Sequence, residues 1–343
     1  MDRVALDQLF RDAAAAYRAD SDETWVIFDE AVKADAVAVG EAAIPLVSSP
    51  DAVERVVAIW ALRQACNICE DTREPSFVPL ASRVGVEDDV DACRCFAQAL
   101  GAVADARAVA PLVALSHHTD ADVRQHVATS LSAALLEQPA QAGIDALLRL
   151  MTDGDNDVRD WATFAIGQQL NVDGIAIRQA LVARLGDTFD DAREEAMVGL
   201  ARRRDRRALP AVIEALRGDA GRLAFAAAEY LADPVLVPLL ELHDSAEVDA
   251  ALQRCDPRRR ASWDERVEEF ASVLQARLDI DFTGAAAAVG CELCETETWL
   301  RIEAVGASEW CVDVLLELDD PTSAADRIIH QLTQHALRRA DTP

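Results

Sequence analysis

Long apolar runs are absent from this chain of 343 residues: no stretch approaches the roughly 18 to 20 residues that a membrane-crossing helix needs. The opening segment, Met1–Asp7, lacks the basic region and the apolar stretch of a secretory signal. Hydrophobic residues still make up 51% of the chain, which excludes a wholly disordered protein. We therefore expect a soluble, cytoplasmic protein with no membrane partner.

Lysine is nearly missing: the 33 basic residues include a single lysine, Lys33, and they face 61 acidic residues, for a net charge of −28. So negative a surface repels phosphate backbones and anionic lipid heads. A local basic patch at 202–207 is the candidate for nucleic-acid binding, and the alternative for it is a solvated loop whose arginines offset nearby acids. The net charge itself suits a basic partner, and it equally suits solubility or adaptation to salt.

The short motifs of common catalytic sites are also missing. The chain contains no glycine-rich phosphate loop and no nucleophile elbow. Carboxylates are so numerous that a pair suited to acid–base chemistry would arise by chance. Eight cysteines in a chain of this length are typical of reduced thiols rather than of a disulfide framework. We therefore expect no enzymatic activity and no cofactor.

A repeated unit is what the chain does contain. The segments 120–127, 155–162 and 189–196 are similar to one another, and related starts are spaced by about 31 to 35 residues, as in helical repeats. In this register the repeats start at Glu54, Ala92, Val123, Val158, Ala192 and Leu223.

Each repeat carries an apolar stripe at the fourth and eighth residues after its start, a spacing that forms one face of a helix. The fourth residues are Ala58, Phe96, Val127, Ala162, Ala196 and Ala227, and the eighth are Leu62, Leu100, Leu131, Ile166, Leu200 and Leu231. A second apolar segment follows, with a proline that suits the first turn of a helix. These prolines are Pro45, Pro79, Pro111, Pro210 and Pro238.

A helical hairpin of this kind cannot bury its apolar face alone, so neighbouring hairpins must stack into a solenoid with a continuous core. We predict a mainly α fold, an α-solenoid of helical hairpins with a small α+β C-terminal segment. An N-terminal capping helix occupies 1–20, about seven repeats occupy 21–256, and the C-terminal segment occupies 257–343.

The C-terminal segment changes its period. Residues 263–278 have the spacing of an amphipathic helix, and 299–305 with 312–318 flank a turn, which predicts a β-hairpin. A capping box then opens a last helix over 323–339. This segment would close the apolar end of the solenoid or form a separate partner-binding module.

The repeats resemble HEAT-like repeats of the phycobilisome-lyase type, through Val-Arg, then Ala, then Leu/Ile-Gly, then Asp-x-Arg-Ala-x-x-Pro-x-Leu. The best matches are Val158–Gly167, Leu100–Leu112 and Asp205–Pro210. The resemblance implies the solenoid, but the family includes scaffolds, adaptors, bilin-attachment lyases and iron-dependent hydroxylases. The hydroxylases bind iron through His-Glu pairs, and none of the six histidines here precedes a glutamate. A lyase or other enzyme acting in the groove is therefore the alternative to a binding protein.

The turns that join one repeat to the next are acidic, and in a solenoid they line up along one edge. The acids are Glu87, Asp88, Asp89, Asp120, Asp122, Asp153, Asp155, Asp157, Asp187, Asp190 and Asp191. Carboxylates before a helix cap its free N–H groups and suit its dipole. The arginines that follow would pair with an acid of the neighbouring repeat to form a ladder; they are Arg55, Arg124, Arg159 and Arg193. Surplus negative charge along this rim would steer a basic partner, with an association rate that falls steeply with salt.

Two cysteine groups have a spacing that is typical of zinc ligands. The repeat register places Cys66 and Cys93 at opposite ends of adjacent helices, roughly 16 Å apart, which is too far for one ion. We therefore expect Cys66-x-x-Cys69 and Cys93-x-Cys95 to pack as small apolar side chains and expect no metal. A zinc or redox pairing of Cys291-x-x-Cys294 with Cys311 is the weaker alternative.

The predicted partner-binding residues combine the rim acids with one aromatic residue: Asp120, Asp122, Asp155, Asp157, Trp161, Asp190 and Asp191. Trp161 lies beside the apolar stripe, where core packing is the usual role, whereas a partly exposed Trp161 would anchor a partner. We predict a non-catalytic scaffold, adaptor or inhibitor that engages a basic protein or peptide. A smooth acidic groove favours this function, and a convergent His/Asp/Cys cluster would favour the enzyme.

Overall fold

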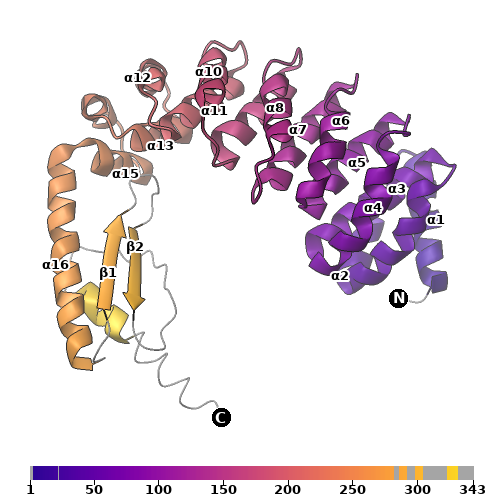
Figure 1. The fold of residues 1–343 in the computed structure, drawn as a ribbon, viewed down its shortest axis with the longest axis horizontal. Coiled ribbons are helices and arrows are strands. Elements are labelled where there is room, and N and C mark those ends of the chain that lie inside the picture. The colour runs from indigo at the N-terminus through magenta and orange to yellow at the C-terminus, as the bar shows by residue number, and fades with distance from the viewer. Residues whose placement is uncertain (1–2, 22, 282–285, 292–297, 304–322, 331–343) are drawn as a thin grey trace. The chain divides into compact units, whose positions relative to one another are not determined.

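The computed structural model describes residues 3–21, 23–281, 286–291, 298–303 and 323–330 (Figure 1). The chain divides into two compact units, Met1–Ala211 and Val212–Pro343. Among the described helices, none has both the length and the apolar content required to cross a bilayer.

The first unit consists of helical hairpins in sequence (Figure 1). Its helices are α1 (Arg3–Arg18), α2 (Glu23–Ala43), α3 (Ala52–Ile68), α4 (Arg73–Arg83), α5 (Val90–Val103), α6 (Val109–Leu115), α7 (Ala121–Leu135), α8 (Gln141–Leu150), α9 (Asn156–Phe164), α10 (Ile175–Arg184) and α11 (Asp190–Arg202). Short 3-10 helices and one π-helix join them: η1 (Ile44–Ser48), η2 (Glu70–Thr72), η3 (Ala106–Ala108), the π-helix η4 (Ala165–Gln169) and η5 (Arg206–Ala208). Helix α12 (Leu209–Arg217) crosses the boundary between the units.

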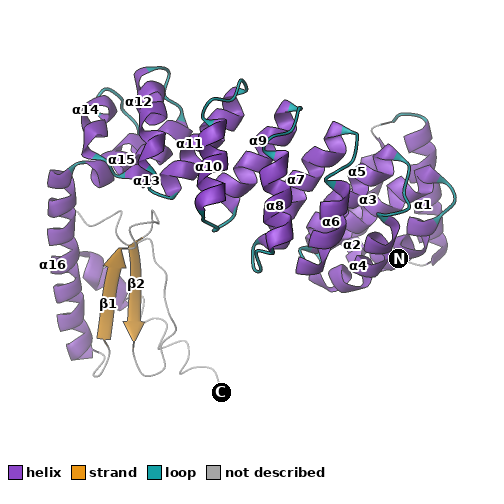
Figure 2. Cartoon of the chain, turned by 45° about the horizontal axis from the view of Figure 1, so that its top comes forward, coloured by secondary structure: helices purple, strands orange, loops and turns teal. Residues whose placement is uncertain are grey.

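Helices α3, α5, α7, α9 and α11, which we call the first helices, form a row in which each packs against the next (Figure 2). The apolar stripe that the repeat register predicts lies in the contacts of this row. Every stripe residue of the first unit, from Ala58 and Leu62 to Ala196 and Leu200, is fully buried. The predicted helical-repeat solenoid is therefore confirmed, since the stripe is what neighbouring hairpins bury against one another.

The first helices begin where the sequence supplies an acceptor for their free N–H groups. Four of them start after an aspartate whose carboxylate accepts a backbone N–H of the first turn. These are Asp51, Asp89, Asp120 and Asp155, at α3, α5, α7 and α9. Phe189 holds the same position before α11, which therefore starts without a side-chain cap.

The prolines of the second segments follow the prediction with one exception. Pro45 lies in the first turn of η1, and Pro111 is the third residue of α6. Pro79, however, lies inside α4, because that helix already starts at Arg73, before the proline by more than one turn. The prediction that Pro79 opens its helix is therefore wrong. Its missing N–H leaves one turn of α4 without the usual backbone hydrogen bond.

Two glycines set the spacing between η4 and α11. A Cβ atom added to Gly199 on α11 would lie 2.7 Å from the Cα atom of Gly167 in η4. No side chain fits at that distance, so glycine at both positions permits the close approach of the two backbones.

The second unit contains α13 (Arg222–Leu231), η6 (Pro234–Leu236), α14 (Val237–Leu240), α15 (Ala246–Cys255), α16 (Pro257–Asp281), β1 (Ala286–Cys291) and β2 (Thr298–Glu303). The two strands pair antiparallel, with Ala286 opposite Glu303, and α16 packs against β1 (Figure 2). The predicted amphipathic face of α16 is buried at Phe270, Leu274 and Leu278.

The predicted hairpin of 299–305 with 312–318 is not the one that the described residues contain. Strand β2 pairs with β1, a strand that the sequence pattern did not predict, and 312–318 lies outside the described residues. The last helix is described over 323–330, and its predicted continuation to Arg339 lies outside. The domain boundaries at residues 20 and 256 stay predictions, as does the role of the C-terminal segment as cap or module.

Candidate protein-interaction surface

In several repeats an arginine reaches the turn of the next repeat and binds a carboxylate there with two hydrogen bonds. Three of the four predicted arginines do so, and we call these pairs the arginine ladder: Arg55 with Glu87, Arg124 with Asp153 and Arg159 with Asp187. The nitrogen–oxygen distances lie between 2.6 and 2.9 Å. Parallel hydrogen bonds of this kind are the strongest geometry that an arginine and a carboxylate form.

The ladder is continuous through Asp187. Its carboxylate binds Arg159 of the preceding repeat, while its backbone carbonyl accepts a hydrogen bond from Nη1 of Arg193 at 2.9 Å. Asp153 has the same double role between Arg124 and Arg159. The side chains of Glu87, Asp153 and Asp187 are only 0, 12 and 2% exposed.

Pairing with arginine lowers the pKa values of these acids. Hydrogen bonds from the Arg159 guanidinium hold the pKa of Asp187 well below its usual range, against the opposing effect of burial. The pKa values of Glu87 and Asp153 are lowered by their arginines in the same way, although burial opposes the shift. These acids are therefore structural, and their charge is not available to a partner.

Two arginines depart from the prediction. Arg193 does not bind an acid of a neighbouring repeat within the first unit; it pairs with Asp190 of its own helix at 2.5 Å. Arg94 was not predicted, because Cys93 occupies the ladder position of α5 and the arginine follows one residue later. From there Arg94 binds Asp120 at 3.1 Å and Asp122 at 2.9 Å.

The predicted partner-binding acids consequently fall into two groups. Asp120 and Asp122 are paired with Arg94, Asp155 caps α9 through two backbone N–H groups, and Asp190 is paired with Arg193. Asp157 and Asp191, in the first turns of α9 and α11, are exposed and form no ion pair among the described residues.

Two further carboxylates that the sequence did not single out, Asp160 and Glu195, lie near enough to Asp191 to be affected by its charge. Burial raises the pKa of Asp160 on α9 to about 6, and the negative charges of Asp191 and Asp157 add to the shift. Burial likewise raises the pKa of Glu195 on α11 to about 7, opposed by a hydrogen bond from Gln168 and reinforced by Asp160. The Oδ1 atom of Asp160 is buried and has no hydrogen-bond partner in the structure.

Aromatic side chains lie beside these acids. Trp161 is 37% exposed, and the ring of Phe164 meets it edge-on at a centroid distance of 5.8 Å. Core packing, the usual role of such a tryptophan, is thus not the role of Trp161. Trp60, at a nearby position of α3, instead packs on Phe28 at 5.6 Å. We define the α9–α11 patch as Asp157, Asp160, Trp161, Phe164, Asp191 and Glu195.

The arginines of the segment at 202–207 differ in exposure: Arg204, Arg206 and Arg207 are exposed, whereas the side chain of Arg203 is buried. Arg203 is 7% exposed and donates to the carbonyls of Ile166, Gly167 and Val172. Burial lowers its pKa to about 10. Arg202 also donates to Gly167, at 3.2 Å, while Arg207 pairs with Asp205. The expectation of a solvated loop is therefore wrong for Arg203, whose guanidinium serves the carbonyls around η4.

The four cysteines of the two predicted groups do not lie together as one cluster of metal ligands within the described residues. Cys66 and Cys93 are free and buried, whereas Cys69 and Cys95 are half-buried. Within the described ranges, no three His, Cys, Asp or Glu side chains are grouped as metal ligands would be. The alternative site of Cys294 with Cys311 lies outside the described residues.

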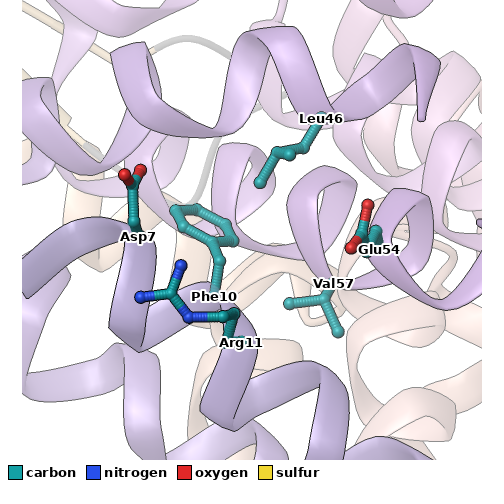
Figure 3. Close-up of a pocket in the computed structure, with 6 residues that line it drawn as sticks. All are labelled: Asp7, Phe10, Arg11, Leu46, Glu54 and Val57. Atoms are coloured by element: carbon teal, nitrogen blue, oxygen red, sulfur yellow. The ribbon is translucent and has the colours of Figure 1, made fainter. Parts of the chain in front are cut away.

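A pocket of about 240 Å³ lies between α1, η1 and α3 (Figure 3). Phe10, Leu46 and Val57 form its apolar part, and Asp7, Arg11 and Glu54 are its charged residues. Arg11 is bonded to Gln8, and Glu54 accepts from Ser49 at 2.5 Å. We interpret the pocket as a packing gap between α1 and the helices that it contacts, and the role of α1 as a cap stays a prediction.

Comparison with known proteins agrees with the repeat geometry. Residues 87–167 match the model of HEAT repeats. The chain is 36% identical over 103 residues to protein YibA of Escherichia coli K12, and this match spans 29% of the chain and 36% of YibA. The repeats are therefore similar to HEAT repeats, as the sequence pattern predicted, while the chain matches only about a third of that relative's length.

Two solved structures share the fold. The X-ray structure of Escherichia coli YibA gives a TM-score of 0.57 at 21% identity, covering 75% of this chain and 98% of that chain. An engineered protein gives a TM-score of 0.52 at 20% identity, covering 68% of this chain and 72% of that chain. Identities this low show the helical-repeat solenoid alone.

Proposed function

We propose that this protein is a non-catalytic scaffold, adaptor or inhibitor that binds a basic protein or peptide on its first helices. The observation that supports this proposal most strongly is the α9–α11 patch. There, a partly exposed tryptophan lies among four carboxylates, and no arginine neutralises them in the described structure. The other predicted acids, Asp120, Asp122, Asp155 and Asp190, contribute at most indirectly, because each already has a structural partner.

A cationic partner would relieve the electrostatic cost of this patch. Asp160 and Glu195 carry raised pKa values because each is partly buried near other negative charges. A lysine or arginine of the partner placed near these acids would favour their charged forms. The same cation could lie on the face of Trp161, an arrangement worth about 0.5 to 2 kcal/mol.

Trp161 has the properties of an interface anchor. Its indole is large, partly exposed and held by the ring of Phe164. Residues of this kind dominate the binding free energy of many interfaces, at about 2 kcal/mol or more on truncation to alanine. Acids around such an anchor chiefly raise the association rate and set the specificity.

An enzyme acting in the groove is the second candidate, and one observation favours it. Asp160 and Glu195 have pKa values near neutrality, a common property of catalytic acids and bases. The burial and mutual repulsion of these acids explain the shifts without catalysis. Nucleic-acid binding at 202–207 has less support, since Arg203 is buried on backbone carbonyls.

The test is affinity capture from the cell of origin, at low and high salt, with identification by mass spectrometry. The wild-type bait is compared with Asp157→Asn/Asp191→Asn, which removes two exposed charges and no described ion pair. Asp155 is left intact because losing a helix cap costs about 1 kcal/mol. The matched control is Glu137→Gln/Asp145→Asn, the same charge change at two exposed positions outside the first helices, one just after α7 and one on α8.

Basic proteins that the wild type and the control retain at low salt, and that the Asp157/Asp191 variant loses, would support the proposal. Equal recovery of the same partners by all three baits would refute it.

A further inference from the structure

A polar hollow of about 330 Å³ lies on the first helices α3, α5 and α7, two repeats before the α9–α11 patch. Arg63 and Asn67 line it from α3, Gln98 from α5, and His126 and Thr129 from α7. No aspartate or glutamate lines it, although the chain contains 61 of them. The only charged side chain of its lining is thus basic, whereas acidic residues outnumber basic ones in the chain as a whole.

Arg63 is the cation of this hollow, and nothing described in the structure neutralises it. Arg55, Arg94 and Arg124 lie on the same three helices, and each binds a carboxylate. Arg63, by contrast, forms no ion pair and donates no hydrogen bond among the described residues. A half-buried guanidinium with five unused donors has the capacity to bind an incoming anion.

The polar residues that α5 and α7 contribute to the hollow are held in place by internal contacts. The amide nitrogen of Gln98 lies 2.9 Å from Nε2 of His126, and the hydroxyl of Thr129 donates to the carbonyl of His126 at 2.9 Å. Gly101 brings α5 close to α7, because a Cβ atom there would lie 2.5 Å from Oγ of Ser130. Polar groups from two helices therefore line the hollow with Arg63 and are fixed by contacts of their own.

We propose that this hollow is a binding site for a carboxylate group. A carboxylate would accept two parallel hydrogen bonds from Arg63, the geometry that a guanidinium favours. Asn67 and Thr129 add neutral polar groups at the rim of the site. The volume is at the low end of the range for small-molecule sites, so it suits one carboxylate with a few attached atoms.

The net charge of −28 does not forbid such a ligand. At about 0.15 M salt the Debye length is about 8 Å, so the exposed acids of distant repeats act only weakly on a group held by Arg63. The nearest acids of α5 and α7, Asp91, Asp120 and Asp122, are all paired with Arg94. The local field of the hollow is therefore set chiefly by Arg63.

The carboxylate can come from a free small molecule or from the C-terminus of a peptide, and the site chemistry is the same for both. The experiment follows the Nε–Hε signal of Arg63 by NMR at constant ionic strength. The probes are succinate, inorganic phosphate, and one acetylated dipeptide with either a free or an amidated C-terminus.

The inference predicts a saturable shift of the Arg63 signal with succinate or the free-carboxylate dipeptide, with a dissociation constant on the order of 1 mM, and none with the amide. Saturation by succinate identifies small carboxylates as sufficient, and saturation by the dipeptide alone identifies a peptide terminus. Either supports the site. Arg63→Gln should abolish saturable shifts of the His126 ring signals, whereas Arg149→Gln on α8 should leave them unchanged.

Three results would overturn the inference: shifts that never saturate, shifts of His126 that persist in Arg63→Gln, or tighter binding of phosphate than of either carboxylate. Both arginine variants are first checked for wild-type unfolding transitions. None of the probes is cationic, so these outcomes do not depend on whether the α9–α11 patch binds a basic partner.

Discussion

The guanidinium of Arg159 binds both carboxylate oxygens of Asp187, 28 residues later in the chain, with both nitrogen–oxygen distances at 2.9 Å. The pair is nearly buried, and Arg159 also donates to three carbonyls of its own turn, those of Asp153, Gly154 and Asp155. One side chain therefore fixes the start of α9 and joins it to the next repeat.

Replacing this arginine should cost far more than replacing its exposed counterpart. Arg159→Ala leaves Asp187 buried without its main partner, and breaking a buried pair in this way costs about 3 to 5 kcal/mol. Arg193→Ala removes a largely exposed pair with Asp190 and one carbonyl contact, and should cost about 1 kcal/mol or slightly more. Urea unfolding at neutral pH measures both. Equal losses in the two variants would contradict a structural role for the ladder.

The pH dependence of the two variants should also differ. Because the folded pKa of Asp187 is depressed, its contribution to stability is present above the unfolded value of about 3.9 and is lost as pH falls toward the folded value. The stability difference between wild type and Arg159→Ala should therefore shrink in acid. Unfolding curves at pH 7 and pH 3 test this, and a constant difference would be the contrary result.

Asp160 and Glu195 should destabilise the protein above neutral pH. A carboxyl group whose pKa is higher in the folded state does not lower the free energy of unfolding at pH values below its unfolded pKa of about 4. Above that pH its destabilising effect grows, until the pH passes the folded pKa of about 6 for Asp160 and about 7 for Glu195. Asp160→Asn should therefore stabilise the protein by about 1 to 2 kcal/mol at pH 8 and by little at pH 4. The measurement is the denaturation midpoint of the wild type and of Asp160→Asn at each of the two pH values. Asp145→Asn, at an exposed position of α8, is the control for the loss of one carboxylate charge.

The contact between Gly167 and Gly199 should not tolerate a methyl group. Gly199→Ala forces α11 away from η4 and should cost about 1 to 3 kcal/mol, as overpacking does. Gly154→Ala is the matched control, since nothing lies within 4 Å of an added Cβ there, and it should change stability by less than about 0.5 kcal/mol. Thermal unfolding compares the two. A neutral Gly199→Ala would show that the repeats are not so closely packed.

Arg203 should be a structural residue and not a phosphate ligand. Arg203→Ala leaves several carbonyls around η4 without a donor and should cost about 2 kcal/mol or more. The exposed Arg217→Ala should be nearly neutral. Both variants and the wild type should flow through a heparin column at low salt. Wild-type retention that Arg203→Ala abolishes would restore the nucleic-acid hypothesis.

The sequence was sufficient to predict the repeats and most of the ladder, because both depend on regular spacing. Apolar residues at fixed intervals predicted the buried stripe, and Arg55, Arg124 and Arg159 stand at equivalent positions. Where the register slips by one residue, as at Arg94, the partner could not be predicted.

The candidate sites were harder to predict. Asp160, Glu195 and Arg63 are polar residues on helix faces, and sequence spacing does not separate a half-buried, unpaired group from a solvated one. That distinction depends on the neighbouring repeat, roughly 30 residues away. The burial of Arg203 similarly depends on the carbonyls that η4 leaves free, and no local pattern marks a π-helix.

The central claim is that the α9–α11 patch binds a cationic partner, and a titration tests it most directly. A short labelled peptide of alternating lysine and arginine is titrated by fluorescence anisotropy into four proteins: wild type, Trp161→Ala, Asp157→Asn/Asp191→Asn and Glu137→Gln/Asp145→Asn. The account predicts tight binding by wild type and by the last pair, and at least about tenfold weaker binding by the other two. Equal weakening by the two double variants, with no effect of Trp161→Ala, would show attraction by net charge alone and would contradict the claim.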